Sequence, residues 1–398
     1  MNRFPRLLTA LGLVGAMLGL EGVARASDAN EVAKPATDLT DVVGPTAIGE
    51  FCDRWRIHPY GWVEASLTTS PLTESDTRTA RVFDAEAEGF RFHQAYLAVE
   101  RVPIAGGGLN GGDVDVGGKI AVLWGADAAL VHARGLCDEQ TGVEQFDLLE
   151  ANAQVRFPVA QGLTIKVGKC TTPMGFEVIE AANDLLPSRS FLFGYAIPFT
   201  HTGAIATLEA SARTSVSYGV VLGWDVFDDN NDALTQLASF AWKSPSEADT
   251  LTVNAILGAE RAGNDDDLRT VVDATWAHTW SESWKTALNA DVGFEQGAAA
   301  GKDATWWGAA GYATRTFTDA LSATARLEYF RDVDGTRLGT PASLAEITLG
   351  LDWKPLCRLP NLRLRPEVRF DHSFDGSFFD DGRDDDQVSL TLDLVFTF

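Results

Sequence analysis

The chain ends in Val388-Ser389-Leu390-Thr391-Leu392-Asp393-Leu394-Val395-Phe396-Thr397-Phe398, and this stretch decides the fold. Its even-numbered positions are all apolar, whereas its odd-numbered positions are mostly polar. Successive side chains of a β-strand point to opposite faces, so the pattern predicts a strand with one apolar and one polar face. Such strands are typical of a barrel whose outside meets lipid and whose inside meets water.

Other segments repeat the alternation with charges. In residues 149–157, Glu150 and Arg156 lie on the polar face, opposite an apolar one. A charged face this regular cannot be buried in a dry core, so we expect it to line a water-filled lumen. In residues 362–371 the apolar face carries Leu362, Leu364, Pro366, Val368 and Phe370, and the charged face carries Arg363, Arg365, Glu367, Arg369 and Asp371.

The whole chain divides into strands of this kind. The turns that follow the fourth, sixth, tenth and twelfth strands are short, whereas many other connections are longer and acidic, which is typical of outer-membrane barrels. We therefore predict an all-β fold, a transmembrane antiparallel β-barrel of about 16 strands. The predicted strands are 57–67, 90–101, 119–127, 145–157, 162–169, 202–210, 214–224, 236–243, 250–258, 268–279, 284–295, 305–316, 321–330, 344–353, 362–371 and 387–398.

Tryptophans near the predicted strand ends favour the same fold, because aromatic girdles mark the two interfaces of a membrane barrel. Ordinary packing in a soluble β-protein is the alternative explanation. The six residues are Trp224, Trp242, Trp280, Trp284, Trp306 and Trp353.

The N-terminus carries an export signal. Arg3 and Arg6 precede an apolar stretch, residues 7–20, that is short for a membrane-spanning helix, and Ala24-Arg25-Ala26 fits a cleavage site. We expect residues 1–26 to be a signal peptide, the alternative being an uncleaved anchor. Residues 27–56 are polar without clear periodicity, which predicts a flexible periplasmic segment, and residues 57–398 form the barrel.

Composition restricts the partners. The formal net charge is −24, which excludes nucleic acid as a natural partner, since phosphate binding needs a basic surface. Apolar residues make up 45% of the chain, yet charges interrupt every apolar run after the leader. An exported chain of this kind is expected in the outer membrane, in contact with its lipid.

Short motifs in the middle of the chain resemble the OmpL-like β-barrel porin family of bacterial outer membranes. The resemblance covers most of the mature chain and is strongest from Phe90 to Asp232. It implies a passive channel but no particular solute. We expect small hydrophilic solutes and ions to diffuse through this channel, and we expect no cofactor. The motifs are Gln94-Ala95-Tyr96-Leu97-Ala98-Val99-Glu100-Arg101, Gly162-Leu163-Thr164-Ile165-Lys166-Val167-Gly168-Lys169, Thr172-Pro173-Met174-Gly175-Phe176-Glu177, Pro187-Ser188-Arg189-Ser190, Pro198-Phe199-Thr200-His201-Thr202-Gly203 and Gly223-Trp224-Asp225.

Residues 171–199 form a long segment without strand periodicity between the fifth and sixth strands. The layout is similar to that of general porins, in which the loop at this place folds into the barrel as a constriction, and a long irregular loop is usually functional. We expect it to fold inward; the alternative is a loop lying over the mouth with solvated acids. We expect the loop to bring the acids Glu177, Glu180 and Asp184 into the pore, opposite Arg363, Arg365 and Arg369 of the wall. Opposed charges of this kind would set the selectivity of the pore. The predicted pore-lining and constriction residues are Glu150, Arg156, Lys166, Glu177, Glu180, Asp184, Arg189, Arg363, Arg365, Glu367 and Arg369.

Two other functions stay open. The outer loops could form a receptor or adhesin surface on a barrel scaffold. A hydrolase could assemble its site from separate strands, although Gly-x-Ser-x-Gly and His-Glu-x-x-His motifs are absent from the sequence and the six histidines show no metal-ligand spacing. We predict no enzymatic activity and no metal site. The sequence leaves a homotrimer and a monomer both open, and we expect the barrel-assembly machinery to recognise the terminal Phe398.

Four cysteines in an exported chain predict disulfides. With a periplasmic N-terminus, strand direction places Cys52 and Cys357 on the periplasmic side, and Cys137 and Cys170 on the outer side. Because a disulfide cannot cross the bilayer, we expect the pairs Cys52–Cys357 and Cys137–Cys170, the alternative being four free thiols.

Overall fold

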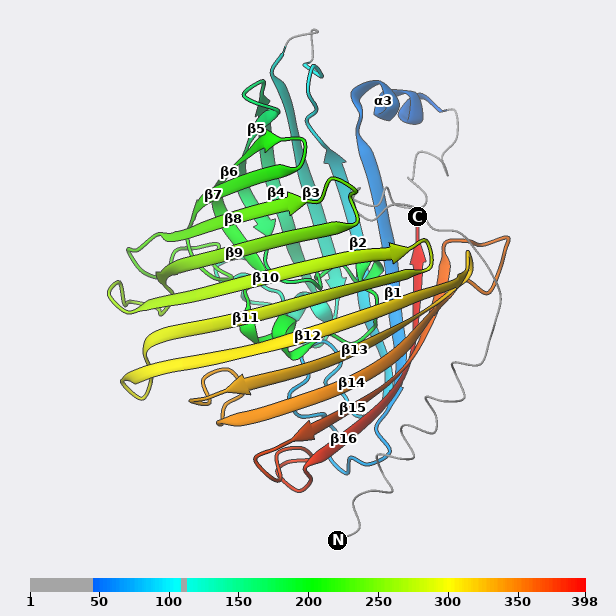
Figure 1. Ribbon diagram of the computed structural model, residues 1–398, viewed down its shortest axis with the longest axis vertical. Helices are drawn as coiled ribbons and strands as arrows, with labels where there is room; N and C mark the ends of the chain where they lie inside the picture. Colours follow the sequence, from blue (N-terminus) through cyan, green and yellow to red (C-terminus); the bar gives the residue numbers. More distant parts are fainter. Residues whose placement is uncertain (1–45, 109–112) are drawn as a thin grey trace.

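Sixteen strands close into one antiparallel barrel, in which each strand pairs with its neighbours along the chain and β1 pairs with β16 (Figure 1). This confirms the predicted barrel and its strand count. The computed structural model describes residues 46–108 and 113–398. The strands are β1 (His58–Thr69), β2 (Gly89–Arg101), β3 (Asp115–Gly125), β4 (Gln145–Phe157), β5 (Gly162–Thr171), β6 (Thr200–Ser211), β7 (Thr214–Val221), β8 (Thr235–Lys243), β9 (Asp249–Ala259), β10 (Leu268–Ser281), β11 (Trp284–Ala299), β12 (Lys302–Thr318), β13 (Leu321–Asp332), β14 (Ala342–Trp353), β15 (Leu362–Ser373) and β16 (Asp386–Thr397).

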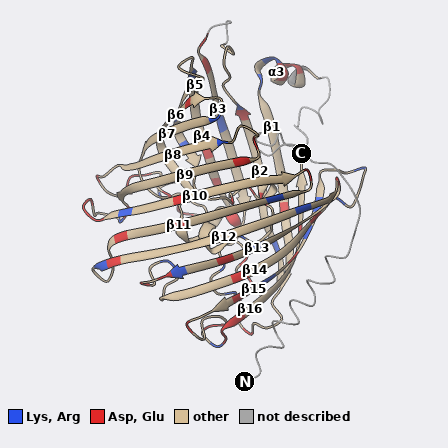
Figure 2. Cartoon of the chain, viewed as in Figure 1, with Lys and Arg blue, Asp and Glu red and all other residues tan. Residues whose placement is uncertain are grey.

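The alternation read from the sequence becomes the two faces of the barrel wall. On β16, Leu392 is 46% exposed on the outer surface, whereas the neighbouring Asp393 is fully buried inside. On β15, Arg365 and Arg369 are fully buried on the inner face, as predicted. Outer surfaces of this kind are covered by lipid in a membrane barrel. In Figure 2 many charged residues lie near strand ends and in loops, with uncharged stretches between them.

The two ends of the barrel differ. One end, here called the turn end, carries the short turns and the last residue, Phe398, whose backbone N–H and C=O bond with the backbone of Gly61 at 2.9 and 2.8 Å. The β2–β3 connection at this end is longer, yet it does not change the strand count. The opposite end, the loop end, carries the long connections 70–88, 126–144, 172–199, 222–234 and 374–385.

A helix, α3 (Ala47–Trp55), precedes the barrel at the turn end (Figure 1). Thr46 caps its N-terminus by accepting the N–H of Gly49, and Arg56 at its C-terminal end pairs with Asp115 at 2.8 Å. Residues 47–55 of the segment 27–56 thus form a regular helix, whereas the flexibility of this segment stays a prediction. The predicted signal peptide and residues 27–45 lie outside the described residues. Among the described residues, no helix is long and apolar enough to cross a membrane.

All four cysteines are free, which contradicts the predicted disulfides Cys52–Cys357 and Cys137–Cys170. Cys170 is buried at the end of β5, whereas Cys137 is exposed in a loop, and Cys52 is buried in α3 whereas Cys357 is exposed in a turn. Lying at the same end of the barrel does not bring two sulfur atoms to the bonding distance of about 2 Å.

The predicted aromatic girdle is partly correct. Trp280, Trp284 and Trp353 are exposed at the turn end by 65, 41 and 46%. Trp306 is instead fully buried on the inner face of β12, where its Nε1 donates to the carbonyl of Ala196 at 3.2 Å. It fits there because Gly293, opposite on β11, has no Cβ, and a Cβ at that position would overlap the indole ring.

We predict that Leu327→Arg weakens folding into lipid vesicles. Leu327 is 64% exposed at the middle of β13, so the charge would enter lipid, which costs about 2–4 kcal/mol near the bilayer midplane. Urea unfolding from vesicles measures the change. Asp319→Arg, in the short turn after β12, is the control and should be nearly neutral. Equal stability of Leu327→Arg and wild type would contradict a lipid-facing outer surface.

Candidate functional site

Residues 172–199, here called the constriction loop, cross the inside of the barrel. They contact inner-face residues on distant parts of the wall. Gln94 on β2 donates to the carbonyl of Ile179 at 2.7 Å, Asn254 on β9 to that of Pro173 at 3.1 Å, and Arg365 on β15 to that of Ala181 at 2.8 Å. The loop therefore folds inward, as predicted, and Figure 1 shows it within the ring of strands.

Arginines of β15 hold the loop by its backbone. Arg363 Nη1 donates to the carbonyl of Ala182 at 2.6 Å, and Arg369 Nη1 to that of Arg189 at 2.6 Å. Arg365 reaches the carbonyl of Asp184 as well, at 3.2 Å. The predicted wall arginines thus contact the loop directly, and Arg365 and Arg369 are buried against it.

Carboxylates bind the same loop through its N–H groups. Glu328 on β13 accepts the N–H groups of Phe191 and Leu192, each at 2.7 Å, and Glu367 accepts that of Ser188 at 3.2 Å. Peptide groups of an irregular loop inside a barrel have little access to water, so these partners replace it.

Glu177 on the loop faces Arg326 on β13 rather than the arginines of β15. Its carboxylate accepts from Arg326 Nη1 at 2.6 Å and from the N–H of Ser190 at 2.6 Å. Arg326 also bonds the carbonyl of Ser188 and pairs with Glu346. Burial alone would raise the pKa of Glu177, but the Arg326 guanidinium and the Ser190 N–H hold it below its usual value.

Glu180 and Glu150 share one lysine. Lys119 on β3 pairs with Glu150 on β4 at 2.6 Å and lies 3.7 Å from Glu180 on the loop. Burial raises the pKa of the Glu180 carboxyl and Glu150 adds to this, while Lys119 opposes it. Asp184 pairs within the loop, with Arg189 at 2.8 Å.

Two predicted basic residues lie away from these contacts. Arg156, near the turn end of β4, binds both oxygens of Glu209 at 2.6 Å each. Lys166 on β5 is half-buried, with no hydrogen bond or ion pair to another described residue. Whether the eleven predicted residues border the path of a solute stays a prediction.

Three residues that hold these contacts, Arg326, Lys119 and Glu328, were not among those predicted from the sequence. Arg326 and Glu328 share a face of β13 with Thr324, so the alternation on that strand could have placed them inside. Lys119 is the first residue of the strand predicted over 119–127, whereas β3 begins at Asp115, so the predicted strand was too short on that side to show the face on which Lys119 lies.

Open space in the lumen lies beside the strands β6–β10. A cavity of about 710 Å³ at the turn end is lined mainly by small and hydroxyl side chains, including Ser215, Thr252 and Thr275, with Phe176 of the constriction loop among them. Phe176 packs on Tyr312 with ring centroids 4.5 Å apart, which fixes this part of the loop.

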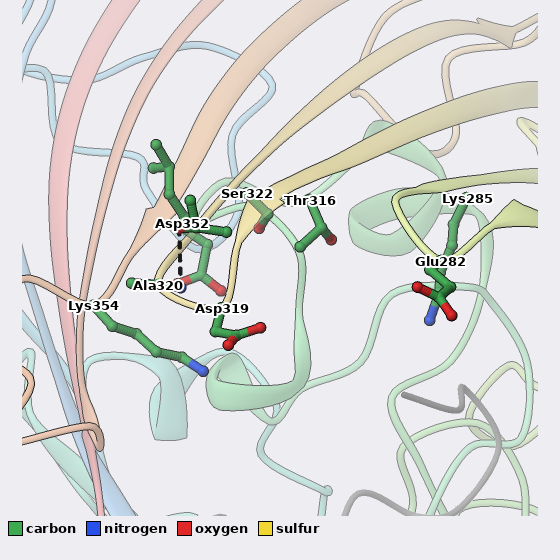
Figure 3. Close-up of a pocket in the computed structure, with 10 residues that line it drawn as sticks. Glu282, Lys285, Thr316, Asp319, Ala320, Ser322, Asp352 and Lys354 are labelled. Carbon is green, nitrogen blue, oxygen red and sulfur yellow. Dashed lines mark hydrogen bonds between the residues drawn. The ribbon is translucent and has the colours of Figure 1, made fainter. Parts of the chain in front are cut away.

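A second cavity at the turn end measures about 360 Å³ and is lined by the turns after β10 and β12 and by the end of β14 (Figure 3). It combines the cations Lys285 and Lys354 with the acids Glu282, Asp319 and Asp352. Side chains of both charge signs therefore line this cavity.

A small enclosed cavity of about 10 Å³ lies between the wall and the loops 70–88 and 172–199. Ser66 Oγ lies 2.8 Å from His93 Nε2, and His93 Nδ1 lies 3.1 Å from Asp127 Oδ1. The order of these groups is that of a hydrolytic triad, but the space beside them holds about one water molecule. Within residues 46–108 and 113–398, no group of three or more His, Cys, Asp or Glu side chains is arranged to hold a metal ion.

A family model described as "Putative beta-barrel porin-2, OmpL-like" matches residues 56–398. The chain belongs to this family and is a porin-like channel of the outer membrane. The turn end consequently faces the periplasm and the loop end faces outward. No curated protein gives a significant match to the chain.

Solved porin structures share the fold. The channel DcaP of Acinetobacter baumannii has a TM-score of 0.56 at 12% identity, covering 86% of this chain and 97% of its own. An anion-selective porin from Comamonas acidovorans has a TM-score of 0.59 at 9% identity, covering 86% and 99%. OprB of Pseudomonas putida has a TM-score of 0.59 at 9% identity, covering 88% and 96%.

We predict that Arg326→Met loosens the constriction loop. The change leaves Glu177 and Glu346 buried without this counter-ion, which costs about 3–5 kcal/mol. Faster hydrogen exchange at the amides of residues 176–191 should accompany lower resistance to urea.

Arg315→Met provides the control, because Arg315 is exposed and only stacks on Trp284 and Phe317. Unchanged exchange in Arg326→Met, or an equal increase in both variants, would refute the role of Arg326 in holding the loop.

Proposed function

We propose that the protein lets small hydrophilic solutes and ions diffuse passively between the constriction loop and the inner faces of β6–β10. The observation that supports this most directly is the cavity of about 710 Å³, lined mainly by small and hydroxyl side chains beside Phe176. Hydroxyl groups can bond to a passing solute as donor or acceptor without holding it by charge. Arg156 and Lys166, on β4 and β5, are proposed to border this passage.

The other predicted constriction residues would serve the same function in a different way, by supporting the constriction loop. Arg365, Arg369, Glu177 and Glu367 are buried and bonded to the loop or wall, so their charges are largely compensated locally. We propose that they fix the width of the passage by holding the loop in place. Width and lining are the main determinants of permeation through such a pore.

We propose that the protein is not an enzyme, although Ser66, His93 and Asp127 form a hydrogen-bonded series. A hydrolase needs space for a substrate carbonyl beside the serine and donors for the oxyanion. The enclosed cavity of about 10 Å³ has no such space. These residues instead connect β1, β2 and the segment after β3.

We predict that the purified protein hydrolyses p-nitrophenyl acetate no faster than its Ser66→Ala variant. Both rates should equal that of a heat-denatured sample, because the serine is closed off from substrate. A faster rate for wild type that disappears in Ser66→Ala would overturn the non-enzymatic assignment.

Assembly is proposed from the family and fold. OmpT of Vibrio cholerae, with a TM-score of 0.54 at 10% identity and covering 86% of this chain and 99% of its own, has a structure in a trimer form. We propose a homotrimer for this protein too. We further propose that barrel-assembly machinery reads the C-terminal Phe398 before β16 closes on β1.

We predict that Ser239→Trp lowers the single-channel conductance by roughly half in planar bilayers, because the bulky ring would enter the passage from β8. Ala238→Trp is the matched control, since residue 238 is the neighbour on the same strand and is exposed on the outer face. Its conductance should equal that of wild type.

The same recordings decide between a channel and a loop-based receptor or adhesin. Wild-type protein without conductance steps would refute the proposed function and favour the receptor. Equal conductance of Ser239→Trp and Ala238→Trp would place the passage elsewhere in the barrel.

A further inference from the structure

An arginine whose guanidinium forms no ion pair with a described carboxylate lies at the outer mouth. Arg337 belongs to the loop 333–341 between β13 and β14, and its guanidinium carbon lies 5.0 Å from the ring centres of both Trp224 and Trp306. Its Nε donates to the carbonyl of Tyr195 in the constriction loop at 2.6 Å. Among the residues that the structure describes, its side chain makes no other hydrogen bond and no ion pair.

The cavity beside Arg337 measures about 580 Å³, and Arg261 and Arg269 line it too. Its two acids already have partners: Glu295 pairs with Arg269 at 2.8 Å, and Asp334 accepts the N–H of Thr305 at 2.9 Å.

Arg261 in turn pairs with Asp267. The positive charge of Arg337 is therefore the one at this cavity that no described carboxylate compensates by direct contact.

The surroundings of Arg337 disfavour its positive charge but hold its guanidinium in one orientation. Burial and the like charge of Arg269 lower the pKa of Arg337 to about 10, although the group stays charged at neutral pH. The two indole rings and the bond from Nε hold the guanidinium plane in place, and both Nη atoms remain available. A guanidinium oriented in this way suits two parallel hydrogen bonds to a carboxylate or phosphate.

We propose that Arg337, assisted by Arg269, forms an oxyanion-binding site at the outer mouth, which captures small solutes carrying a carboxylate or phosphate group before they reach the constriction loop. This rests on the proposed channel function and names a class of solute for it. The acidic outer loops do not exclude such a site, since charges farther than about 8 Å are largely screened at physiological salt.

The main alternative to anion binding is that Arg337 has a purely structural role. The guanidinium also links loop 333–341 to the constriction loop through Tyr195, so its removal could simply loosen both. Arg337→Lys separates the two explanations. It keeps the charge for an anion but loses the planar group that stacks on two indole rings.

The test measures binding of inorganic phosphate and of succinate to the detergent-solubilised full-length protein by isothermal titration calorimetry. Arg337→Gln should weaken phosphate binding about tenfold or more, and Arg337→Lys should restore part of it. Arg383→Gln is the control, because Arg383 lies on loop 374–385 and already pairs with Glu74. Thermal unfolding of all variants shows whether the fold is retained.

Bilayer recordings give the second readout: Arg337→Gln should shift the reversal potential in a phosphate gradient towards cation selectivity. Three results would each overturn the site. Wild-type protein could bind neither phosphate nor succinate, Arg337→Gln could bind them as tightly as wild type, or Arg337→Gln and Arg383→Gln could lose the same affinity. If the wild-type protein produced no conductance, the proposed channel function would be refuted. The calorimetry would still decide whether the anion site exists.

Discussion

Irregular backbone inside a membrane barrel needs hydrogen-bond partners, and the rest of this lumen depends on how that need is met. The constriction loop runs through 28 residues, 172–199, whose regular structure is limited to two short helical turns, η2 (Ala181–Asn183) and η3 (Leu192–Ala196). Arg326, Arg363, Arg365 and Arg369 supply donors for its carbonyls. Carboxylates on β13 and β15 supply acceptors for its N–H groups. The charged inner wall is thus largely a binding surface for the loop.

This use of charge divides the lumen into two parts. Beside β13–β16 the side chains are buried and the charges are paired, as with Arg365 between Asp393 and Glu64. Beside β6–β10 the open cavity is lined mainly by hydroxyl and small side chains, together with the charged Glu209, Arg213 and Lys243. Under the proposed function, solutes pass through the second part, so many of the inner charges read from the sequence hold the loop instead of bordering the path of a solute.

Period-two alternation was enough to predict the barrel, its strand count and the inward face of β15, because burial on one face and lipid on the other fix every second side chain. Alternation gives the face of a residue but neither its height in the barrel nor its partner across the lumen. Hence Glu177 was expected opposite Arg363, Arg365 and Arg369, yet it binds Arg326 on β13. The predicted disulfide pairs were wrong for the same reason. Strand direction gave the side of the membrane for each cysteine but not the position of its sulfur atom along and across the barrel. The prediction that Trp306 belongs to an interfacial girdle was wrong. It rested on the position of Trp306 near a strand end, whereas the opposite Gly293 leaves room for the indole ring inside the barrel.

The way the loop is held bears on whether it can act as a gate. Moving it would break several buried contacts at once, among them the Arg326–Glu177 pair and the bonds of Arg365 and Arg369 to loop carbonyls. Removing one partner of a buried pair costs about 3–5 kcal/mol, and a loop movement with a comparable cost would leave under 1% of molecules with a displaced loop. Under the proposed function, selectivity at the constriction is then set by a fixed width and lining. Any change of permeability with conditions has to arise at the mouths, where side chains such as Arg337 and Lys285 meet water and where local charge is not fully compensated.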